Sequence, residues 1–132
     1  MDRLFLDANV LFSAAYRAEA GVARLWKLDS AVLLTSEYAV AEARRNLADD
    51  DQRLRLNRLL DGLEVTSGGS VAPDDRKGID LPEKDWPILG GAVAAGATHL
   101  ITGDVRHFGS YFGHRLFGLV ITPPADYLRS AP

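Results

Sequence analysis

The sequence predicts an α/β fold in which a parallel sheet lies between two layers of helices. Short apolar runs that suit strands alternate along the chain with segments whose apolar residues recur at helical spacing. Such alternation is typical of a parallel sheet with right-handed crossover connections. The chain has 132 residues, 47% of them hydrophobic, which is enough for one core and too short for two ordinary domains. We therefore expect one domain over residues 1–132.

The N-terminal half should supply three strands and the helices between them. The run from Ala31 to Leu34 is apolar throughout, which suits a strand covered on both faces. Thr35 and Ser36 can cap the helix that follows. In order, the predicted elements are a strand at 4–6, helical segments at 9–16 and 20–28, a strand at 31–34, helices at 37–47 and about 54–63, and a short strand at 64–66.

The C-terminal half begins with residues 67–84, a segment rich in Gly, Ser, Pro and Asp that has no periodicity. We interpret it as a loop and as a candidate for mobility near a site. Asp85 and Pro87 open the next helix well, as an N-cap and a first-turn proline. The remaining predictions are a helix at 88–97, a strand at 99–102, a turn at 103–104, an irregular segment to about 114, a strand at 116–121 and a helical turn at 124–129.

Composition excludes several classes of protein. The chain has no cysteine, which rules out disulfides, thiolate-bound zinc and a cysteine nucleophile. Residues 86–103 carry no formal charge, but Pro87 and four glycines favour a short helix and a buried strand over a membrane span. The N-terminus has no basic region followed by an apolar signal segment, so we expect a cytoplasmic protein without a membrane partner. The net charge of −3 argues against binding nucleic acid through general positive charge.

Four acidic residues occupy positions from which they could converge. Asp7 follows the first predicted strand and Asp104 the fourth, so both should lie at the carboxyl edge of the sheet, where parallel sheets bind ligands. Glu42 lies about two turns into the helix after the second strand, and Asp85 starts the helix before the fourth. Together they form a candidate catalytic and metal-binding site.

Carboxylates of this kind suit Mg²⁺ or Mn²⁺ better than zinc or copper. Such ions can activate water and stabilise the leaving oxygen of a phosphodiester, so the predicted chemistry is phosphodiester hydrolysis. This also answers the objection from charge, since without the four acids the formal charge of −3 would become +1.

Each acid also has a purely structural explanation. Asp7 and Asp85 could cap helices, and Asp104 could be an ordinary turn residue. Glu42 could be a solvated residue paired with Arg45 or Asn46. The joint placement of all four favours the functional interpretation.

Other polar residues could assist the four acids. Asn9 and Thr102 could orient a carboxylate or a metal-bound water from the second shell of ligands, or could be local backbone caps. Arg44 and Arg45 could contact RNA phosphates, although solvated helix charges explain most arginines of this region equally well. His107 has no metal-ligand spacing, and a general-base role for it competes with that of a surface histidine.

These motifs resemble the PIN domain family, and in particular VapC-type toxins of bacterial toxin-antitoxin systems. The resemblance covers nearly the whole chain and rests on LFLDANVLFSA, VAEARRNL, LPEKDWPILGGAVAAGATHLITGDVRHFG and ITPPADYL. Asp7, Glu42, Asp85 and Asp104 match the acidic quartet of that family in order and spacing. Thr102 resembles its hydroxyl residue just before the last acid.

The resemblance implies a PIN-like sheet of strand order 3-2-1-4-5 and dependence on Mg²⁺ or Mn²⁺. It implies an endoribonuclease that cleaves single-stranded RNA and leaves a 5′-phosphate and a 3′-hydroxyl. It further implies a cognate antitoxin as partner and a homodimer. The nuclease inference is the firmer one, because PIN domains also occur outside toxin pairs.

Two rival functions remain open from the sequence. A haloacid dehalogenase-type phosphatase would use Asp7 as nucleophile, but the position two residues later holds Asn9 in place of the required acid. A non-catalytic PIN-like module could bind RNA or a protein without cutting it. Metal binding at Asp7, Asp85 and Asp104 would distinguish the nuclease from this module.

Overall fold

The computed structural model describes residues 1–131 and contains a six-stranded sheet with helices on both faces. The strands are β1 (Asp2–Leu6), β2 (Ala31–Ser36), β3 (Glu64–Thr66), β4 (His99–Ile101), β5 (Arg115–Leu116) and β6 (Leu119–Thr122). The α-helices are α1 (Ala8–Tyr16), α2 (Glu37–Asn46), α3 (Asp50–Leu60), α4 (Trp86–Ala94), α5 (Val105–Phe108) and α6 (Pro124–Ser130). The 3₁₀ turns are η1 (Gly21–Lys27), η2 (Pro73–Arg76), η3 (Glu83–Asp85) and η4 (Gly109–Tyr111).

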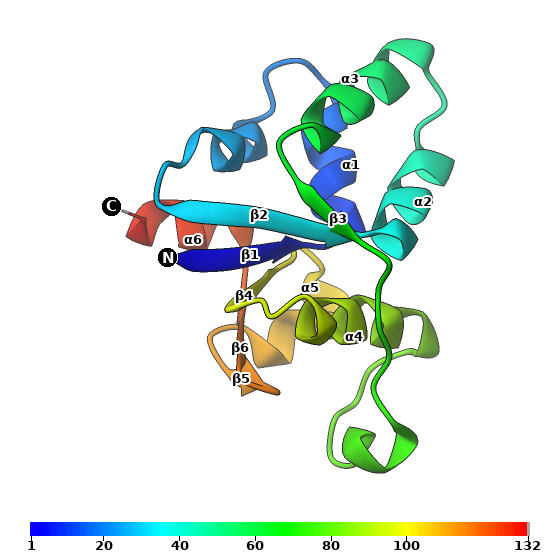
Figure 1. The fold of residues 1–132 in the computed structure, drawn as a ribbon, viewed down its shortest axis with the longest axis vertical. Helices are drawn as coiled ribbons and strands as arrows, with labels where there is room; N and C mark the ends of the chain where they lie inside the picture. Colours follow the sequence, from blue (N-terminus) through cyan, green and yellow to red (C-terminus); the bar gives the residue numbers. More distant parts are fainter. Residues whose placement is uncertain (132) are drawn as a thin grey trace.

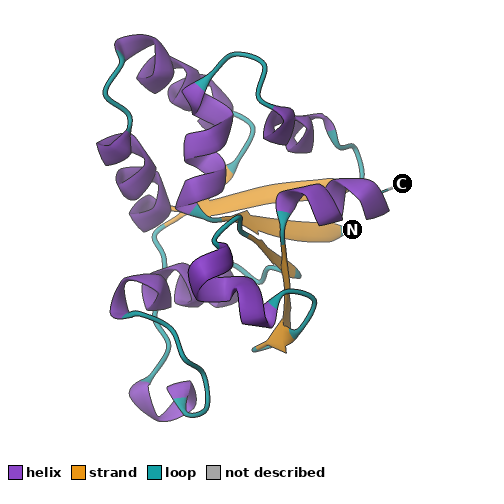
Figure 2. Cartoon of the chain, turned by 180° about the vertical axis from the view of Figure 1, so that it is seen from behind, coloured by secondary structure: helices purple, strands orange, loops and turns teal. Residues whose placement is uncertain are grey.

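The sheet has the order β3-β2-β1-β4-β6-β5, and every neighbouring pair except β5 and β6 is parallel. The chain moves from β1 to β3 in one direction and then crosses back to β4 and β6. Right-handed crossovers therefore place α1, α2 and α3 on one face and α4 and α5 on the other. Figure 1 shows these two layers above and below the sheet, and Figure 2 shows them from behind. The predicted three-layer α/β/α class is thus confirmed.

The core is centred on β1, whose residues Leu4, Phe5 and Leu6 are fully buried. A central parallel strand is covered on both faces, which explains its continuous apolar run. On either side, β2 and β4 pair with β1 in a register that ends the three strands at one edge of the sheet. That edge carries the residues that follow β1 and β4 in the chain.

The last predicted strand, at 116–121, is wrong in one respect. It is a hairpin of β5 and β6, so the sheet has one antiparallel edge strand more than the expected order 3-2-1-4-5. The turn residues Phe117 and Gly118 both have positive φ, 53° and 83°. A two-residue turn of this conformation reverses the chain tightly, and glycine adopts it without strain.

Two predicted irregular segments contain short helical turns. The segment after Asp104 includes α5 and η4, and residues 67–84 include η2 and part of η3. Arg76 fastens the second segment: its Nε donates to Val71 O, its guanidinium pairs with Glu83 at 3.2 Å, and it lies over the Trp86 ring at 4.8 Å. No helix within residues 1–131 is long and apolar enough to cross a membrane.

Candidate active site

Asp7 ends β1 and begins α1, and its carboxylate is enclosed by three donors. Oδ1 accepts from the Ala8 amide at 2.6 Å. Oδ2 accepts from the Thr102 hydroxyl at 2.8 Å and from the side-chain Nδ2 of Asn9 at 3.1 Å. Only 3% of Asp7 is exposed to solvent. Asp7 therefore does cap α1, as the structural explanation required, and also faces the residues that follow β4.

Thr102 and Asn9 connect the ends of β1 and β4. Besides donating to Asp7, the Thr102 hydroxyl accepts from the Asp104 amide at 3.1 Å and from Asn9 Nδ2 at 3.3 Å. Asn9 Oδ1 accepts from the Gly103 amide at 2.9 Å. The two side chains thus hold Asp7 and the backbone of Asp104 in fixed relative positions, which is what residues behind a ligand shell do.

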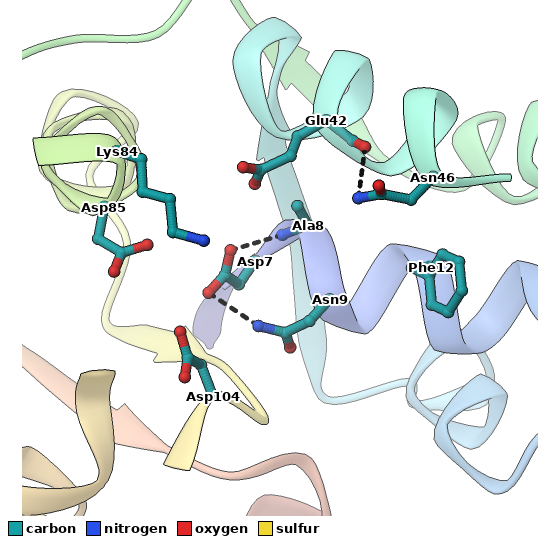
Figure 3. A pocket seen from close by; sticks show the side chains of 9 residues that line it. All are labelled: Asp7, Ala8, Asn9, Phe12, Glu42, Asn46, Lys84, Asp85 and Asp104. Atoms are coloured by element: carbon teal, nitrogen blue, oxygen red, sulfur yellow. Dashed lines mark hydrogen bonds between the residues drawn. The ribbon is translucent and has the colours of Figure 1, made fainter. Parts of the chain in front are cut away.

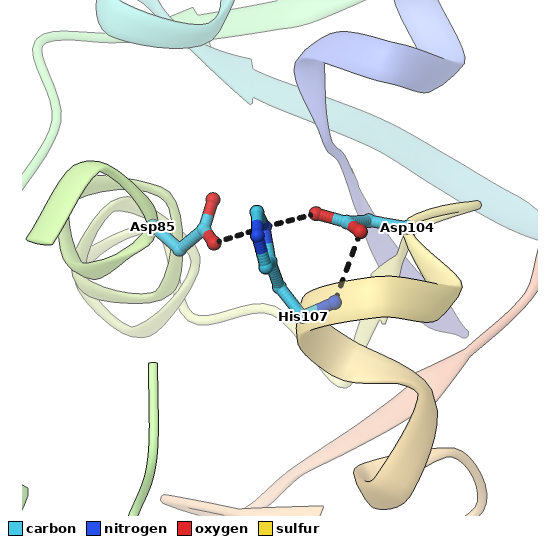
Figure 4. A group of neighbouring side chains, drawn as sticks. All are labelled: Asp85, Asp104 and His107. Atoms are coloured by element: carbon cyan, nitrogen blue, oxygen red, sulfur yellow. Dashed lines mark hydrogen bonds and ion pairs between the residues drawn. The ribbon is translucent and has the colours of Figure 1, made fainter. Parts of the chain in front are cut away.

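Asp104 and Asp85 approach each other from opposite sides of His107 (Figure 4). His107 Nδ1 lies 2.8 Å from Asp104 Oδ2 and 2.9 Å from Asp85 Oδ2. Asp104 also caps α5 by accepting from the His107 amide. The Asp85 side chain makes no capping hydrogen bond to α4, so the structural explanation fails for Asp85.

The short contacts of His107 with the two acids are not aligned as hydrogen bonds. Asp85 Oδ2 and His107 Nδ1 are both buried and have no hydrogen-bond partner among the described residues. Because the distances are short enough for a bond, it must be the direction of the ring N–H that fails. A buried carboxylate oxygen without a donor is rare and suggests that another group normally meets it.

Glu42 comes from α2 on the far side of the same cavity (Figure 3). Its carboxylate forms no salt bridge with Arg45, and Asn46 donates to its backbone oxygen only, at 3.1 Å. Among residues 1–131, the pairing offered as a structural explanation of Glu42 is therefore not present.

All four predicted acids line one cavity of about 580 Å³. Figure 3 shows their carboxylates entering it from different segments of the chain. Asp85 and Asp104, with His107, have potential ligand atoms within 4.8 Å of one another, whereas Asp7 and Glu42 lie outside this closest group. The cavity walls also include Phe12, Asn46 and Lys84.

Burial and the charges of neighbouring acids raise the pKa values of two of the carboxyl groups, those of Asp7 and Asp85. Burial raises the pKa of Asp7 most, the charges of Asp85 and Glu42 add to it, and the bonds from Thr102 and Ala8 oppose it, so that the pKa is about 7. Burial also raises the pKa of Asp85, which His107 lowers and Asp104 raises. Concentrating acids in a partly closed cavity is costly unless a cation neutralises them.

The residues fit a hard divalent cation. Four carboxylates line the cavity, and one oxygen of Asp85 is buried and forms no aligned hydrogen bond with a described residue. Mg²⁺ and Mn²⁺ bind such oxygen ligands and keep some water. Asp85 and Asp104, with the nearby Asp7 and Glu42, are the residues that would hold such a cation.

Sequence reasoning underrated His107 and overlooked Lys84 as a cavity residue. His107 meets the two acids only because Asp104 caps α5 and turns the chain back within three residues, inside a segment predicted to be irregular. The capping pattern of an Asp three residues before the His was the available clue. Lys84 lines the cavity beside Asp85, and its positive charge lowers the pKa of Asp85.

Arg44 and Arg45 do not line the acidic cavity. They border a separate hollow of about 450 Å³ together with Ala41 and Arg53. Arg44 donates to Asn57 Oδ1 at 2.8 Å, which ties α2 to α3. Both arginines are exposed, so contact with RNA at this hollow stays a prediction.

No model of a protein family matches the sequence, and neither does any curated protein. A solved structure does match in three dimensions: the crystal structure of VapBC2 from Rickettsia felis bound to a DNA fragment from their promoter. One of its chains aligns with a TM-score of 0.60 and 16% sequence identity, over 92% of this chain and 98% of that one. The two chains share one fold. At this identity the similarity extends to the fold alone, and it agrees with the PIN-like architecture expected from the sequence.

Proposed function

We propose that the protein is a metal-dependent endoribonuclease that hydrolyses phosphodiester bonds of single-stranded RNA in the acidic cavity. The observation that carries the proposal is the meeting of Asp7, Glu42, Asp85 and Asp104 around one cavity. The identity of the substrate as RNA is supported by the resemblance to PIN-domain nucleases.

Asp85, Asp104, Asp7 and Glu42 are the residues that would hold Mg²⁺ or Mn²⁺. Such a cation would supply an activated water and neutralise the charge that develops on the phosphate. Thr102 and Asn9 hold Asp7 in place by donating to its Oδ2. This fixed arrangement would keep the carboxylate oriented throughout the reaction.

Lys84 and His107 would balance charge around the reacting phosphate. Lys84 is exposed at the cavity rim, where its ammonium can contact a phosphate oxygen. His107 lies between Asp85 and Asp104, where a protonated imidazole would reduce the repulsion between them. With the acids neutralised by a cation, the remaining positive charges would favour an approaching polyanion.

The test is cleavage of a mixed-sequence single-stranded RNA by purified protein with Mg²⁺ or Mn²⁺. We expect cleavage that EDTA abolishes and that Asp7→Asn and Asp104→Asn each eliminate. Asp74→Asn, in η2 and not among the residues that line the cavity, should retain cleavage. A wild-type protein that neither cuts RNA nor binds a divalent cation would contradict the proposal and favour a non-catalytic RNA- or protein-binding module.

We also propose that the protein is the toxin of a toxin-antitoxin pair and that it forms a homodimer in the cytoplasm. The structural relative is VapBC2, crystallised with a DNA fragment from their promoter. By analogy of fold, this relative supports a toxin-antitoxin pair. Co-expression with the product of the adjacent open reading frame should yield a stable complex that no longer cleaves RNA. Failure of the two proteins to co-purify would contradict the antitoxin proposal.

A further inference from the structure

One face of helix α1 is only partly covered by the rest of the described chain. Asn9, Phe12, Ser13 and Tyr16 recur at the spacing of a single helical face and are partly or fully exposed. The opposite face is buried in the core through Ala8, Val10, Leu11, Ala14 and Ala15. The exposed face begins at the acidic cavity, because Asn9 and Phe12 line that cavity (Figure 3).

Two further hollows continue from the acidic cavity along this face. One, of about 310 Å³, shares Phe12 with the cavity and is also lined by Tyr16 and Arg17. The other, of about 400 Å³, shares Asn9 with the cavity and has Arg24 in its wall. Both hollows contain an arginine, and no carboxylate lines either of them among the described residues.

Phe12 and Tyr16 form an aromatic pair on the exposed face. Their ring centroids are 5.3 Å apart and their planes are inclined by 36°. Tyr16 is 56% exposed. The pair therefore offers aromatic surface to solvent directly beside the acidic cavity.

Helix α3 holds the exposed aromatic residue in position. Arg55 Nη1 donates to Ala15 O at 2.7 Å, and Gln52 Nε2 donates to Tyr16 O at 3.1 Å. These bonds satisfy carbonyls that the end of a helix would otherwise leave open. Because this backbone is already ordered, the protein loses less conformational entropy when a ligand binds to the side chain.

We infer that Phe12 and Tyr16 form a stacking surface for the bases of single-stranded RNA next to the bond to be cut, with Arg17 and Arg24 contacting its backbone. The inference rests on the proposed function and extends it to how the substrate is held. Unpaired bases expose faces that stack on aromatic rings, whereas bases in a duplex do not. Aromatic and guanidinium groups, in two hollows that no carboxylate of the described residues lines, suit a polyanion with flat bases better than an apolar peptide.

The test is equilibrium binding of a fluorescently labelled single-stranded RNA in EDTA, so that metal-dependent cleavage cannot interfere. We expect Tyr16→Leu to weaken binding about tenfold, because stacking of one base on an aromatic residue accounts for an effect of this order. Tyr16→Phe should bind as the wild type does. Phe117→Leu, an exposed aromatic on the β5–β6 turn, is the matched control and should have no effect.

A second single-stranded RNA, whose nucleotides lack their bases, distinguishes the loss of stacking from a change in the shape of the protein. On this strand the wild type and Tyr16→Leu should bind equally weakly, because no base remains to stack. Equal affinity of wild type and Tyr16→Leu for the normal strand, or no binding by the wild type, would overturn the inference. Binding of an apolar peptide that depends on Tyr16, together with no binding of RNA, would also overturn the inference.

Cleavage measured separately distinguishes this inference from the proposed function. Tyr16-dependent binding by a protein that neither cleaves RNA nor binds a divalent cation would support the stacking surface and refute the nuclease. Cleavage with binding that does not depend on Tyr16 would refute the stacking surface and leave the nuclease standing.

Discussion

Asp7 is buried, bonded by three donors and placed against two other acids, so its proton makes metal-free stability depend on pH. Burial raises its pKa from 3.8 to about 7. Between these values the folded protein binds a proton that the unfolded chain has released. Stability without metal should therefore fall as the pH rises from about 4 to about 7. Asp85, whose pKa is also raised, adds a slope of the same sign.

Asp7→Asn should flatten this dependence. The amide has no proton to lose, so we expect a smaller decrease in melting temperature from about pH 5 to about pH 8 and a more stable metal-free protein at the upper end. Thermal unfolding in EDTA at several pH values measures both effects. Equal slopes for wild type and Asp7→Asn would show that Asp7 is ionised throughout this range.

Thr102 acts through the two acids that it connects. Its hydroxyl is fully buried, donates to Asp7 and accepts from the Asp104 amide. Thr102→Val keeps the shape and removes these two bonds as well as the one that Asn9 Nδ2 donates, so we expect Mn²⁺ affinity to fall by about 10- to 100-fold in titration calorimetry.

Thr122→Val is the matched control for Thr102→Val. Thr122 lies on neighbouring β6, and its hydroxyl donates only to Val120 O of the same strand. Affinity that falls equally in the two variants would mean that strand distortion, and not the loss of the bonds to the acids, weakens metal binding.

At the scale of elements, α4 and the segment before it are in contact through two glycines. A Cβ on Gly90 would lie 2.6 Å from Ser70 Cα and 2.7 Å from Gly69 O, both of them backbone atoms. Gly90→Ala gains about 1 kcal/mol of helix propensity but forces this backbone apart, at a cost of about 1–3 kcal/mol. We expect net destabilisation in urea unfolding.

Val93→Ala on the same helix is the control for Gly90→Ala, because Val93 is 41% exposed and packs little. It should change the free energy of unfolding by less than about 1 kcal/mol. If Gly90→Ala proved more stable than the wild type, residues 67–72 would have to move away from α4 at little cost.

The elements of the fold were largely predictable because their cause is local. Continuous apolar runs marked β1 and β2, and Ser36, Asp7 and Pro87 marked helix starts. The β5–β6 hairpin was missed because a short apolar run gives no sign of reversal except the Phe117-Gly118 turn. The contact of Gly90 with residues 69–70 could not be predicted either, since it depends on the path of a loop without periodicity.

At the scale of the molecule, the four acids come from segments that only the complete sheet brings together. The sequence predicted that Asp7 and Asp104 lie at one edge of the sheet, because each follows a strand and parallel strands end at the same edge. The separation of Asp7 and Glu42 from the closest ligand group depends on helix positions that no sequence pattern specifies. The contact between His107 and Asp85 could not be predicted either, because it depends on how α5 lies relative to the start of α4.

Because the cavity joins distant segments, a bound cation should stabilise the whole fold. A ligand that binds only the folded state raises stability in proportion to the logarithm of its concentration, by about 2.7 kcal/mol at 100 times Kd. We expect Mn²⁺ to raise the melting temperature of the wild type at about pH 8, and much less at about pH 5, where Asp7 is protonated.

Asp85→Asn should lose most of this stabilisation by Mn²⁺, whereas Asp74→Asn on η2 should retain it. Differential scanning fluorimetry with a manganese series measures the shift for each protein. A shift of the same size in Asp85→Asn would indicate that the cation binds elsewhere on the acidic surface.

Anomalous diffraction from crystals soaked in Mn²⁺ tests the central claim most directly, namely that the four acids form one divalent-cation centre. The account predicts an anomalous peak in the cavity, in contact with Asp85 and Asp104 and close to Asp7 and Glu42, and no such peak in crystals of Asp104→Asn. Fully soaked wild-type crystals with an empty cavity, and with His107 still between the two aspartates, would contradict it.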